Sequence, residues 1–416
     1  MDIQKYVEEI CRQTREAVPV IANMPTADKN NLLMKLAAEM RKKAPYLISE
    51  NEKDLAAARE SGLSGAMIDR LALNSERIDG MARSIEEIAA LEDPVGRVEN
   101  MKTRPSGIRV GQMRIPLGVA AVIYEARPNV TTDIAALCIK SGNASILRGG
   151  RESINSNIAL YELVSETLTD SGYPAGIVTL ITRTERELVP VLLKQNKYID
   201  VVIPRGGEGL IRRVTEESTI PVIKHDKGLC HTFVDATAEE DMANSIAVNA
   251  KVHRPGVCNA MECLLIHQDY PHKESLLTAM IDQKVELRGC PETVKILPDI
   301  IVPAKEEDFD TEYLDLKCSV RVVDSIDDAI VHIHRHGSEH SECIVTSDYF
   351  MADRFLKEVD SSAVFVNSST RFHDGGEFGL GAEVGISTEK LHARGAMGVE
   401  GLTTLKYIIY GRGEIR

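Results

Sequence analysis

The N-terminal part of the chain has hydrophobic residues at helical spacing, up to about residue 95. Leu33, Leu36 and Met40 would share one face of a helix, and a second helix is predicted over residues 46–60. Over residues 97–116 the pattern changes to short extended pieces, one of which is typical of an arm of a β-hairpin. The chain is therefore expected to open with helices and a hairpin.

From residue 118 onward, strands and helices alternate. Residues 118–124 are apolar throughout, which is typical of a strand covered on both faces. The strand candidates are residues 118–124, 144–148, 176–181, 198–204, 262–267, 319–323, 342–346 and 363–367. Repeated strand–helix–strand units predict an α/β fold with doubly wound parallel sheets.

The C-terminal region differs from this alternation. Residues 368–401 are rich in glycine and poorly periodic, too long for a simple connection. The last strand candidate, residues 402–411, is apolar for a chain terminus, and we expect it to pair with the early hairpin of another subunit.

Composition narrows the class of protein. The chain has 416 residues, 43% of them hydrophobic and 27% charged, so two or three globular domains are expected. No apolar run approaches the ~18 residues of a membrane helix. The charged N-terminus has no apolar signal region.

Acidic residues exceed basic ones by 63 − 49 = 14, which argues against general binding to nucleic acid or anionic membranes. The eight cysteines include no C-x-x-C pair, as expected of a reduced, cytoplasmic protein.

Two strand-to-helix turns carry glycines that would suit an anionic ligand. Gly206 and Gly207 follow the strand 198–204, and Gly149 follows Arg148 at the end of the strand 144–148. Glycine lets the backbone approach a ligand closely, a helix N-terminus favours an anion, and arginine pairs well with phosphate. Tight turns with solvated arginines are the structural alternative.

Cys258 lies in the loop His253-Arg254-Pro255-Gly256-Val257-Cys258-Asn259, just before a strand. Positive neighbours raise the thiolate fraction of a cysteine, so a nucleophile is predicted here. Cys263 falls inside the following strand, where burial is expected. A structural role for Cys258 is the alternative.

Two polar clusters follow further along the chain. His332, His336 and His340 could share a helical face and bind a metal, but Gly337 is expected to end the helix. A solvated helix end is favoured, and no metal site is predicted. Arg371, with the hydroxyls of Ser368, Ser369 and Thr370 at a strand end, could hold a carboxylate; a surface loop is the alternative.

The chain resembles the γ-glutamyl phosphate reductases, a family within the aldehyde dehydrogenase superfamily. The resembling stretches are IYEARPNVTTDIAALCIKSGNASILRGG, IPRGGEGLI, PVIKHDKG, VCNAMECLLIH, HSECIVT and VNSSTRFHDGGEFGLGAEVGISTEKLHARGAMGVEGLTTLKY. The resemblance implies an aldehyde dehydrogenase-like fold with a Rossmann-like NADP(H) domain, a catalytic domain and a small β oligomerisation element. The implied parts are 1–107 with 126–238 for NADP(H), 239–366 for catalysis, 108–125 with 385–416 for oligomerisation, and 367–384 as a substrate or linker loop.

The resemblance also implies roles for single residues. Cys258 matches the family nucleophile and Asn129 an oxyanion-hole donor. Arg148 would suit the 2′-phosphate of NADPH, and Glu342 resembles the glutamate that binds the nicotinamide ribose. The implied cofactor residues are Arg148, Gly149, Gly206, Gly207 and Glu342. The candidate substrate residues are Arg127, Arg254, Ser369, Thr370 and Arg371.

The implied activity is NADPH-dependent reduction of L-glutamyl 5-phosphate to L-glutamate 5-semialdehyde, with release of phosphate, in proline biosynthesis. One alternative activity is irreversible NAD(P)-dependent aldehyde oxidation. Another alternative is that the protein keeps the fold as a binding protein but has lost catalytic activity. Hydrolytic relatives carry a glutamate base where this chain has Lys224-His225-Asp226, which favours the reductase. A homo-oligomer and a transient contact with glutamate 5-kinase are further expectations.

Overall fold

The computed structural model describes residues 2–224 and 227–416, and the chain divides into two compact units. The first unit comprises Met1–Lys224, Gly379–Gly385 and Met397–Arg416. The second comprises His225–Phe378 and Ile386–Ala396. Neither unit is a single continuous segment of the chain.

The first unit opens with the helical layer that the sequence predicts. Its helices are α1 (Ile3–Ala22), α2 (Thr26–Lys42), α3 (Ala44–Glu60), α4 (Gly65–Leu71), α5 (Ser75–Ala90), α6 (Asn129–Lys140), α7 (Ile154–Thr169), α8 (Leu188–Leu192) and α9 (Glu208–Glu217). Its strands are β1 (Val98–Thr103), β2 (Arg109–Pro116), β3 (Val119–Tyr124), β4 (Ala144–Arg148), β5 (Val178–Leu180), β6 (Val201–Arg205) and β16 (Thr403–Tyr410).

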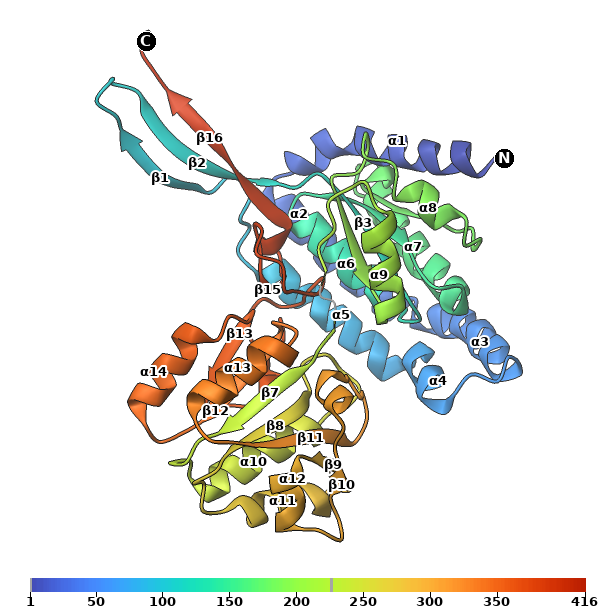
Figure 1. Ribbon diagram of the computed structural model, residues 1–416. Coiled ribbons are helices and arrows are strands. Elements are labelled where there is room, and N and C mark those ends of the chain that lie inside the picture. The colour runs from blue at the N-terminus through green and yellow to red at the C-terminus, as the bar shows by residue number, and fades with distance from the viewer. Residues whose placement is uncertain (1, 225–226) are drawn as a thin grey trace. The chain divides into compact units, whose positions relative to one another are not determined.

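A four-stranded parallel sheet forms the centre of this unit, in the order β5-β4-β3-β6. Helices α1 and α8 pack together, and α1 lies against β3, β4 and β5. Helix α6 contacts β3 and β4, and α7 contacts β5 (Figure 1). Every residue of β3 is buried, as its continuous apolar pattern predicts for a strand covered on both faces.

A separate three-stranded antiparallel sheet, in the order β1-β2-β16, extends from the first unit with the C-terminus at its end (Figure 1). Strand β16 pairs with β2 of the same chain, from Thr403 opposite Pro116 to Tyr410 opposite Arg109. The last strand therefore pairs with the early hairpin as expected, but with the hairpin of its own chain and not with that of another subunit. Because β16 supplies the partner itself, the hairpin is completed within one chain.

The second unit is built on a seven-stranded parallel sheet in the order β10-β9-β11-β8-β7-β12-β13. Its strands are β7 (Cys230–Val234), β8 (Met261–His267), β9 (Glu286–Gly289), β10 (Val302–Pro303), β11 (Lys317–Val323), β12 (Ser341–Val345) and β13 (Ala363–Val366), with a small pair β14 (Ile386–Ser387) and β15 (Gly395–Ala396). Its helices are α10 (Glu240–Val252), α11 (Lys273–Asp282), α12 (Pro291–Ile296), α13 (Ile326–His336) and α14 (Tyr349–Glu358). One apolar cluster joins the sheet to α10 and α11, and another joins it to α13 and α14.

Short 3₁₀ turns connect these elements. They are η1 (Arg151–Ser153), η2 (Ala175–Ile177), η3 (Glu306–Asp310), η4 (Thr370–Phe372) and η5 (Glu400–Leu402). Of these, η4 follows β13 and η1 follows β4, so both lie at strand ends.

The boundary between the units lies earlier than the position expected from the resemblance. Strand β7, which the periodicity does not predict, pairs with β8 and β12 and so places residues before 238 in the second unit. Strand β3, expected in the oligomerisation element, lies in the four-stranded sheet, and β1 takes its place in the hairpin. Among the helices of the described residues, none is long and apolar enough to cross a membrane.

Candidate active site

The first unit gathers its candidate residues at a topological switch point. The chain runs from β3 to β4 to β5 on one side and then returns to β6 on the other side of β3. Ligands of open α/β sheets bind outside the carboxyl ends of the strands at such a point. The residues at these ends are Tyr124 and Arg205, which are partners in the β3–β6 register, and Arg148, which pairs with Ile123.

Gly206 and Gly207 follow β6 at this edge and lead into α9. A Cβ atom at Gly206 would lie 2.6 Å from Cδ of Glu125, so a larger residue would displace that carboxylate from its place beside the turn. The amide of Gly207 donates a hydrogen bond to Oε2 of Glu125 at 3.0 Å. The N-terminal end of α9 therefore already binds one anion, a carboxylate of the chain itself. Sequence reasoning missed Glu125; its place directly after β3, facing the glycine turn, is the signal that could have found it.

Gly149 is held against a buried polar network. A Cβ atom at Gly149 would lie 2.2 Å from Nδ2 of Asn157 and 2.9 Å from Cε2 of Tyr124. The hydroxyls of Tyr124 and Thr131 are hydrogen-bonded at 2.7 Å, and Thr131 donates to Oδ1 of Asn157 at 3.1 Å. This network fixes the backbone of the turn, so the lack of a side chain at Gly149 is a requirement of packing.

Arg148 ends β4 and is half-buried. One of its guanidinium nitrogens donates to the carbonyl of Gly149 at 2.8 Å, while its Nε is buried without a partner. Burial lowers the pKa of Arg148; Glu152 and Tyr124 act in the opposite direction, and the charges of Arg186 and Arg213 lower the pKa further. Three guanidinium groups near one strand end form a local cationic site in a net-negative protein, as a phosphate ligand requires.

Asn129 and Arg127 lie in the turn after β3, and both are exposed. Asn129 is the first residue of α6, and its Nδ2 donates to Oδ2 of Asp133 at 2.9 Å. Burial raises the pKa of Asp133 to about 6, although the bond from Asn129 and the charge of Arg205 act in the opposite direction. Asp133 therefore orients the Asn129 amide.

The second unit carries Cys258, in the loop between α10 and β8. Among the described residues it is the single cysteine that is not buried; the other seven, Cys263 included, are. Access to solvent is what separates a reactive cysteine from a structural one. The exposure supports Cys258 over Cys263 as the nucleophile.

The Cys258 loop is held from two sides. Nδ2 of Asn259 donates to the carbonyl of His373 at 2.9 Å, and Oγ1 of Thr370 donates to the carbonyl of Asn259 at 2.8 Å. A Cβ atom at Gly228 would lie 2.1 Å from the carbonyl oxygen of Cys258 and 2.4 Å from its Cα. Gly228 thus supports the Cys258 loop by backbone packing, a contact that sequence reasoning missed, although Gly228 lies in the quoted stretch PVIKHDKG.

A second thiol lies against the same loop. The buried Sγ of Cys230 donates to the carbonyl of Cys258 at 3.1 Å. Burial raises the pKa of Cys230 well above its usual value, so this thiol stays protonated. Sequence reasoning missed this contact, because it crosses from the start of β7 to a loop that is distant in sequence.

Arg371 and Arg254 supply positive charge near Cys258. Burial lowers the pKa of Arg371 and the charge of Arg254 lowers it further, whereas a Cys258 thiolate acts in the opposite direction. Nε of Arg371 is a buried donor without a partner. Ser369 is buried, and its Oγ accepts from the Arg371 amide at 3.3 Å. Thr370 is fully buried and donates its hydroxyl to the carbonyl of Asn259, so it positions the loop; its role as a substrate ligand stays a prediction.

Glu342 lies in the interior of the second unit, on β12. Its Oε2 accepts hydrogen bonds from the amide of His231 at 2.7 Å and from Nδ1 of His231 at 3.0 Å. Burial raises the pKa of Glu342, and His231 acts in the opposite direction. In this arrangement the carboxylate is directed at His231, and its role as a ribose ligand stays a prediction.

The histidine cluster differs from the sequence-based expectation. Helix α13 begins at an N-cap where Ser325 accepts from the Asp328 amide, and it ends before Gly337 as predicted. His332, His336 and His340 are buried, however, so the expected solvated helix end is wrong. The helix packs against η3, where Phe309 contacts both His332 and His336 and Asp310 is bonded to Nδ1 of His336 at 2.8 Å.

Comparisons with known proteins place these features in a family. A model of the aldehyde dehydrogenase family matches residues 3–289. The γ-glutamyl phosphate reductases of Moorella thermoacetica and Geobacter metallireducens are each 52% identical to this chain over 100% of both lengths. The chain belongs to the γ-glutamyl phosphate reductases of the aldehyde dehydrogenase family. Membership confirms the resemblance and makes the protein an oxidoreductase that uses a nicotinamide cofactor.

Solved structures agree with this family assignment. The crystal structure of γ-glutamyl phosphate reductase from Thermotoga maritima is 42% identical, covers 99% of each chain and has a TM-score of 0.95. A glyceraldehyde-3-phosphate dehydrogenase GapN from Methanocaldococcus jannaschii, solved with NADP, is 14% identical with a TM-score of 0.70 over 98% of this chain and 95% of its own. The second likeness shows the fold alone. Both confirm the expected aldehyde dehydrogenase-like α/β fold.

Proposed function

We propose that the protein reduces L-glutamyl 5-phosphate to L-glutamate 5-semialdehyde with NADPH and releases inorganic phosphate, a step of proline biosynthesis. The proposal is supported by the names of relatives that are 52% identical over the whole chain. The observation that carries the proposal is the setting of Cys258. Its thiol is half-buried, Arg254 and Arg371 lie nearby, and Gly228 packs against the backbone of its loop.

The chemistry begins at Cys258. Its thiolate attacks the acyl carbon of the substrate, the bond to the phosphate oxygen breaks, and a thioester and free phosphate form. Asn129 is proposed to donate a hydrogen bond to the oxyanion, a type of contact whose loss typically costs roughly 3–4 kcal/mol of barrier. When bound, the dinucleotide supplies the hydride that reduces the acyl carbon. The Cys258 sulfur then leaves as thiolate, and the aldehyde is released.

The residues of the first unit fit a phosphorylated dinucleotide. A Cβ atom at Gly149 would overlap the buried Asn157 side chain, and one at Gly206 would displace the Glu125 carboxylate. Arg148 has a buried donor without a partner and lies near two further arginines. We assign NADP(H) binding to this unit and the acyl transfer to the second. The sequence has Lys224-His225-Asp226 where hydrolytic relatives carry a glutamate base. His225 and Asp226 lie outside the described residues.

The need for inorganic phosphate distinguishes the proposed reaction from hydrolytic aldehyde oxidation. Run in reverse, the enzyme is expected to reduce NADP⁺ with glutamate 5-semialdehyde only when inorganic phosphate is added. Acyl phosphate should then form in an amount equal to the NADPH. Turnover at the same rate without phosphate, with free glutamate as the product, would favour the hydrolytic alternative instead.

Substitution of Arg371 by alanine is expected to weaken binding of the glutamyl substrate. Its unpartnered, buried Nε suits the substrate carboxylate, and a hydrogen bond between charged groups is worth about 1.5–3 kcal/mol. The KM for glutamate 5-semialdehyde should rise about 10- to 100-fold, while the KM for NADP⁺ stays the same. Arg354→Ala on α14 is the matched control because it also removes one arginine of this unit. An equal rise in both variants would contradict the assignment.

Substitution of Arg148 by alanine is expected to reduce the preference for NADPH over NADH. The lost group would contact the 2′-phosphate, which NADH lacks, so the KM for NADPH should rise about 10- to 100-fold and that for NADH should change little. Steady-state kinetics with both dinucleotides measure the ratio. Arg83→Ala, at an exposed position of α5, serves as the control. Equal losses with both dinucleotides would remove Arg148 from the 2′-phosphate site.

We also propose that the three-stranded sheet joins subunits of a homo-oligomer. Strand β16 is an edge strand of this sheet, and its Leu405, Tyr407, Ile409 and Tyr410 are exposed. Exposed apolar residues on an edge strand are typical of an interface. The transient contact with glutamate 5-kinase stays a prediction.

A further inference from the structure

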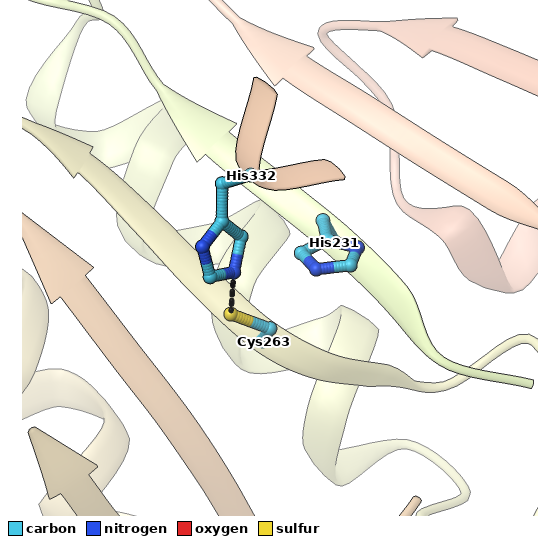
Figure 2. A group of neighbouring side chains, drawn as sticks. All are labelled: His231, Cys263 and His332. Atoms are coloured by element: carbon cyan, nitrogen blue, oxygen red, sulfur yellow. Dashed lines mark hydrogen bonds between the residues drawn. The ribbon is translucent and has the colours of Figure 1, made fainter. Parts of the chain in front are cut away.

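The second unit brings two histidines and a cysteine together in its interior, apart from the residues assigned to the reaction. His231 lies on β7, Cys263 on β8 and His332 on α13 (Figure 2). His231 and Cys263 are directly opposite in the β7–β8 register, and α13 adds His332 from above the sheet. One ligand atom from each lies within 4.8 Å of the other two, and all three residues are buried. We propose that these side chains bind one thiophilic metal ion, of the Zn²⁺ class.

The nitrogen of His231 that faces the cluster is free to act as a ligand. Nδ1 of His231 is bonded to Glu342, and its Nε2 is a fully buried atom without a hydrogen-bond partner. A neutral imidazole that donates its Nδ1 proton to a carboxylate presents a lone pair at Nε2. Metal-binding histidines almost always have such a carboxylate or carbonyl behind them. The orphaned Nε2 and the Glu342 contact are therefore both explained by an ion.

Cys263 and His332 have the separation of two ligands on one ion. Sγ of Cys263 and Nε2 of His332 are 3.6 Å apart. With a Zn–S distance of about 2.3 Å and a Zn–N distance of about 2.0 Å, two ligands of a tetrahedron lie about 3.5 Å apart, close to this separation. The third ligand, His231, needs a small movement toward this pair. A water molecule would supply the fourth ligand.

Binding of the ion requires two protons to move. The Cys263 thiol loses its proton to solvent and becomes the thiolate ligand. In the ion-free state Arg321 donates to Nδ1 of His332 at 2.9 Å, which keeps the His332 proton on Nε2, between the ring and Cys263. That proton must transfer to Nδ1, and Arg321 must turn away, toward Glu306 at 3.4 Å. Arg321 thus opposes the ion, both by its charge and by the tautomer that it stabilises.

An ion at this position would hold Glu342 through His231. The chain of contacts is metal, imidazole and carboxylate, which fixes the rotamer of both side chains. Two neighbouring strands, β7 and β8, and helix α13 would also be joined at one point. The inference does not depend on the proposed reaction, because none of its three ligands is assigned to substrate or cofactor.

The test uses the full-length protein, stripped by a chelator and titrated with Co²⁺ and then Zn²⁺. We expect one equivalent of Co²⁺ with a thiolate-to-cobalt charge-transfer band, displaced by Zn²⁺. Cys258→Ala should keep the band, and Cys263→Ala should lose it and bind Zn²⁺ at least about 100-fold more weakly. A band that survives in Cys263→Ala or vanishes in Cys258→Ala, or a native chain without stoichiometric binding, overturns the site.

A second variant tests the tautomer and leaves all three proposed ligands in place. Arg321→Gln removes the opposing charge and offers an amide oxygen to the Nδ1 proton, so Zn²⁺ should bind about tenfold more tightly. Circular dichroism of each stripped variant establishes that it is folded. An affinity in Arg321→Gln that is unchanged or weaker would exclude His332 as a ligand.

Discussion

Alanine at position 258 is expected to abolish the phosphate-dependent reduction of NADP⁺ by glutamate 5-semialdehyde. In the proposed mechanism the thioester forms on this sulfur, so its removal takes away the group that attacks the acyl carbon. Loss of an enzyme's nucleophile removes most of its rate enhancement, and we expect kcat to fall by more than about 10³-fold. The half-buried position of Cys258 means that alanine leaves no large cavity, and the variant should remain folded.

Cys11→Ala is the matched control, because Cys11 is fully buried in α1 of the first unit. It should lose some stability and no activity. Binding of dinucleotide to Cys258→Ala, followed by fluorescence, should match the native enzyme. Turnover of Cys258→Ala above about 1% of the native rate would remove Cys258 from the role of nucleophile.

Replacement of Gly228 by alanine should have the second-largest effect on turnover. The new methyl group would overlap the carbonyl and Cα of Cys258, and because these are backbone atoms the loop itself must move. Displacement of a reacting group by about 1 Å can cost about 10²-fold in rate. We expect kcat to fall about 10²-fold, with little change in the KM for NADP⁺, since four of the five proposed cofactor residues lie in the first unit and none belongs to the Cys258 loop.

Gly80→Ala provides the comparison in steady-state kinetics. Gly80 lies inside α5 with no atom within 4 Å of an added Cβ, so alanine should stabilise the helix by up to about 1 kcal/mol and leave turnover unchanged. A Gly228→Ala enzyme with native kcat would show that the position of the Cys258 backbone tolerates movement.

Much of the fold could be predicted from periodicity. The continuous apolar run at β3 and the glycine that ends α13 gave correct elements, because each depends on a local pattern of burial or backbone conformation. Strand β7 was not predicted, although it is central in its sheet. Its residues, Cys230–Val234, mix small, polar and aromatic side chains, and their burial depends on neighbours supplied by β8 and β12.

The candidate site was less predictable than the fold. Cys258 stands out in the sequence because of its charged and tightly turning neighbours. The contacts of Glu125 with Gly207 and of Gly228 with Cys258 join segments that are distant along the chain, and no local pattern records them. The burial of His332 and His336 also depends on a segment that is distant along the chain. Phe309 of η3 covers a face of α13 that the sequence alone predicts to be polar and solvated.

The pairing of β2 with β16 has a consequence for biosynthesis of the protein. These partners are separated by most of the chain, so one edge of β2 stays unpaired during synthesis until β16 has been made. Contacts between distant segments form slowly, and open edges promote association with other chains. Completion of this sheet must therefore wait for the synthesis of β16, and nascent chains stalled before β16 should be especially prone to aggregate or to require chaperones.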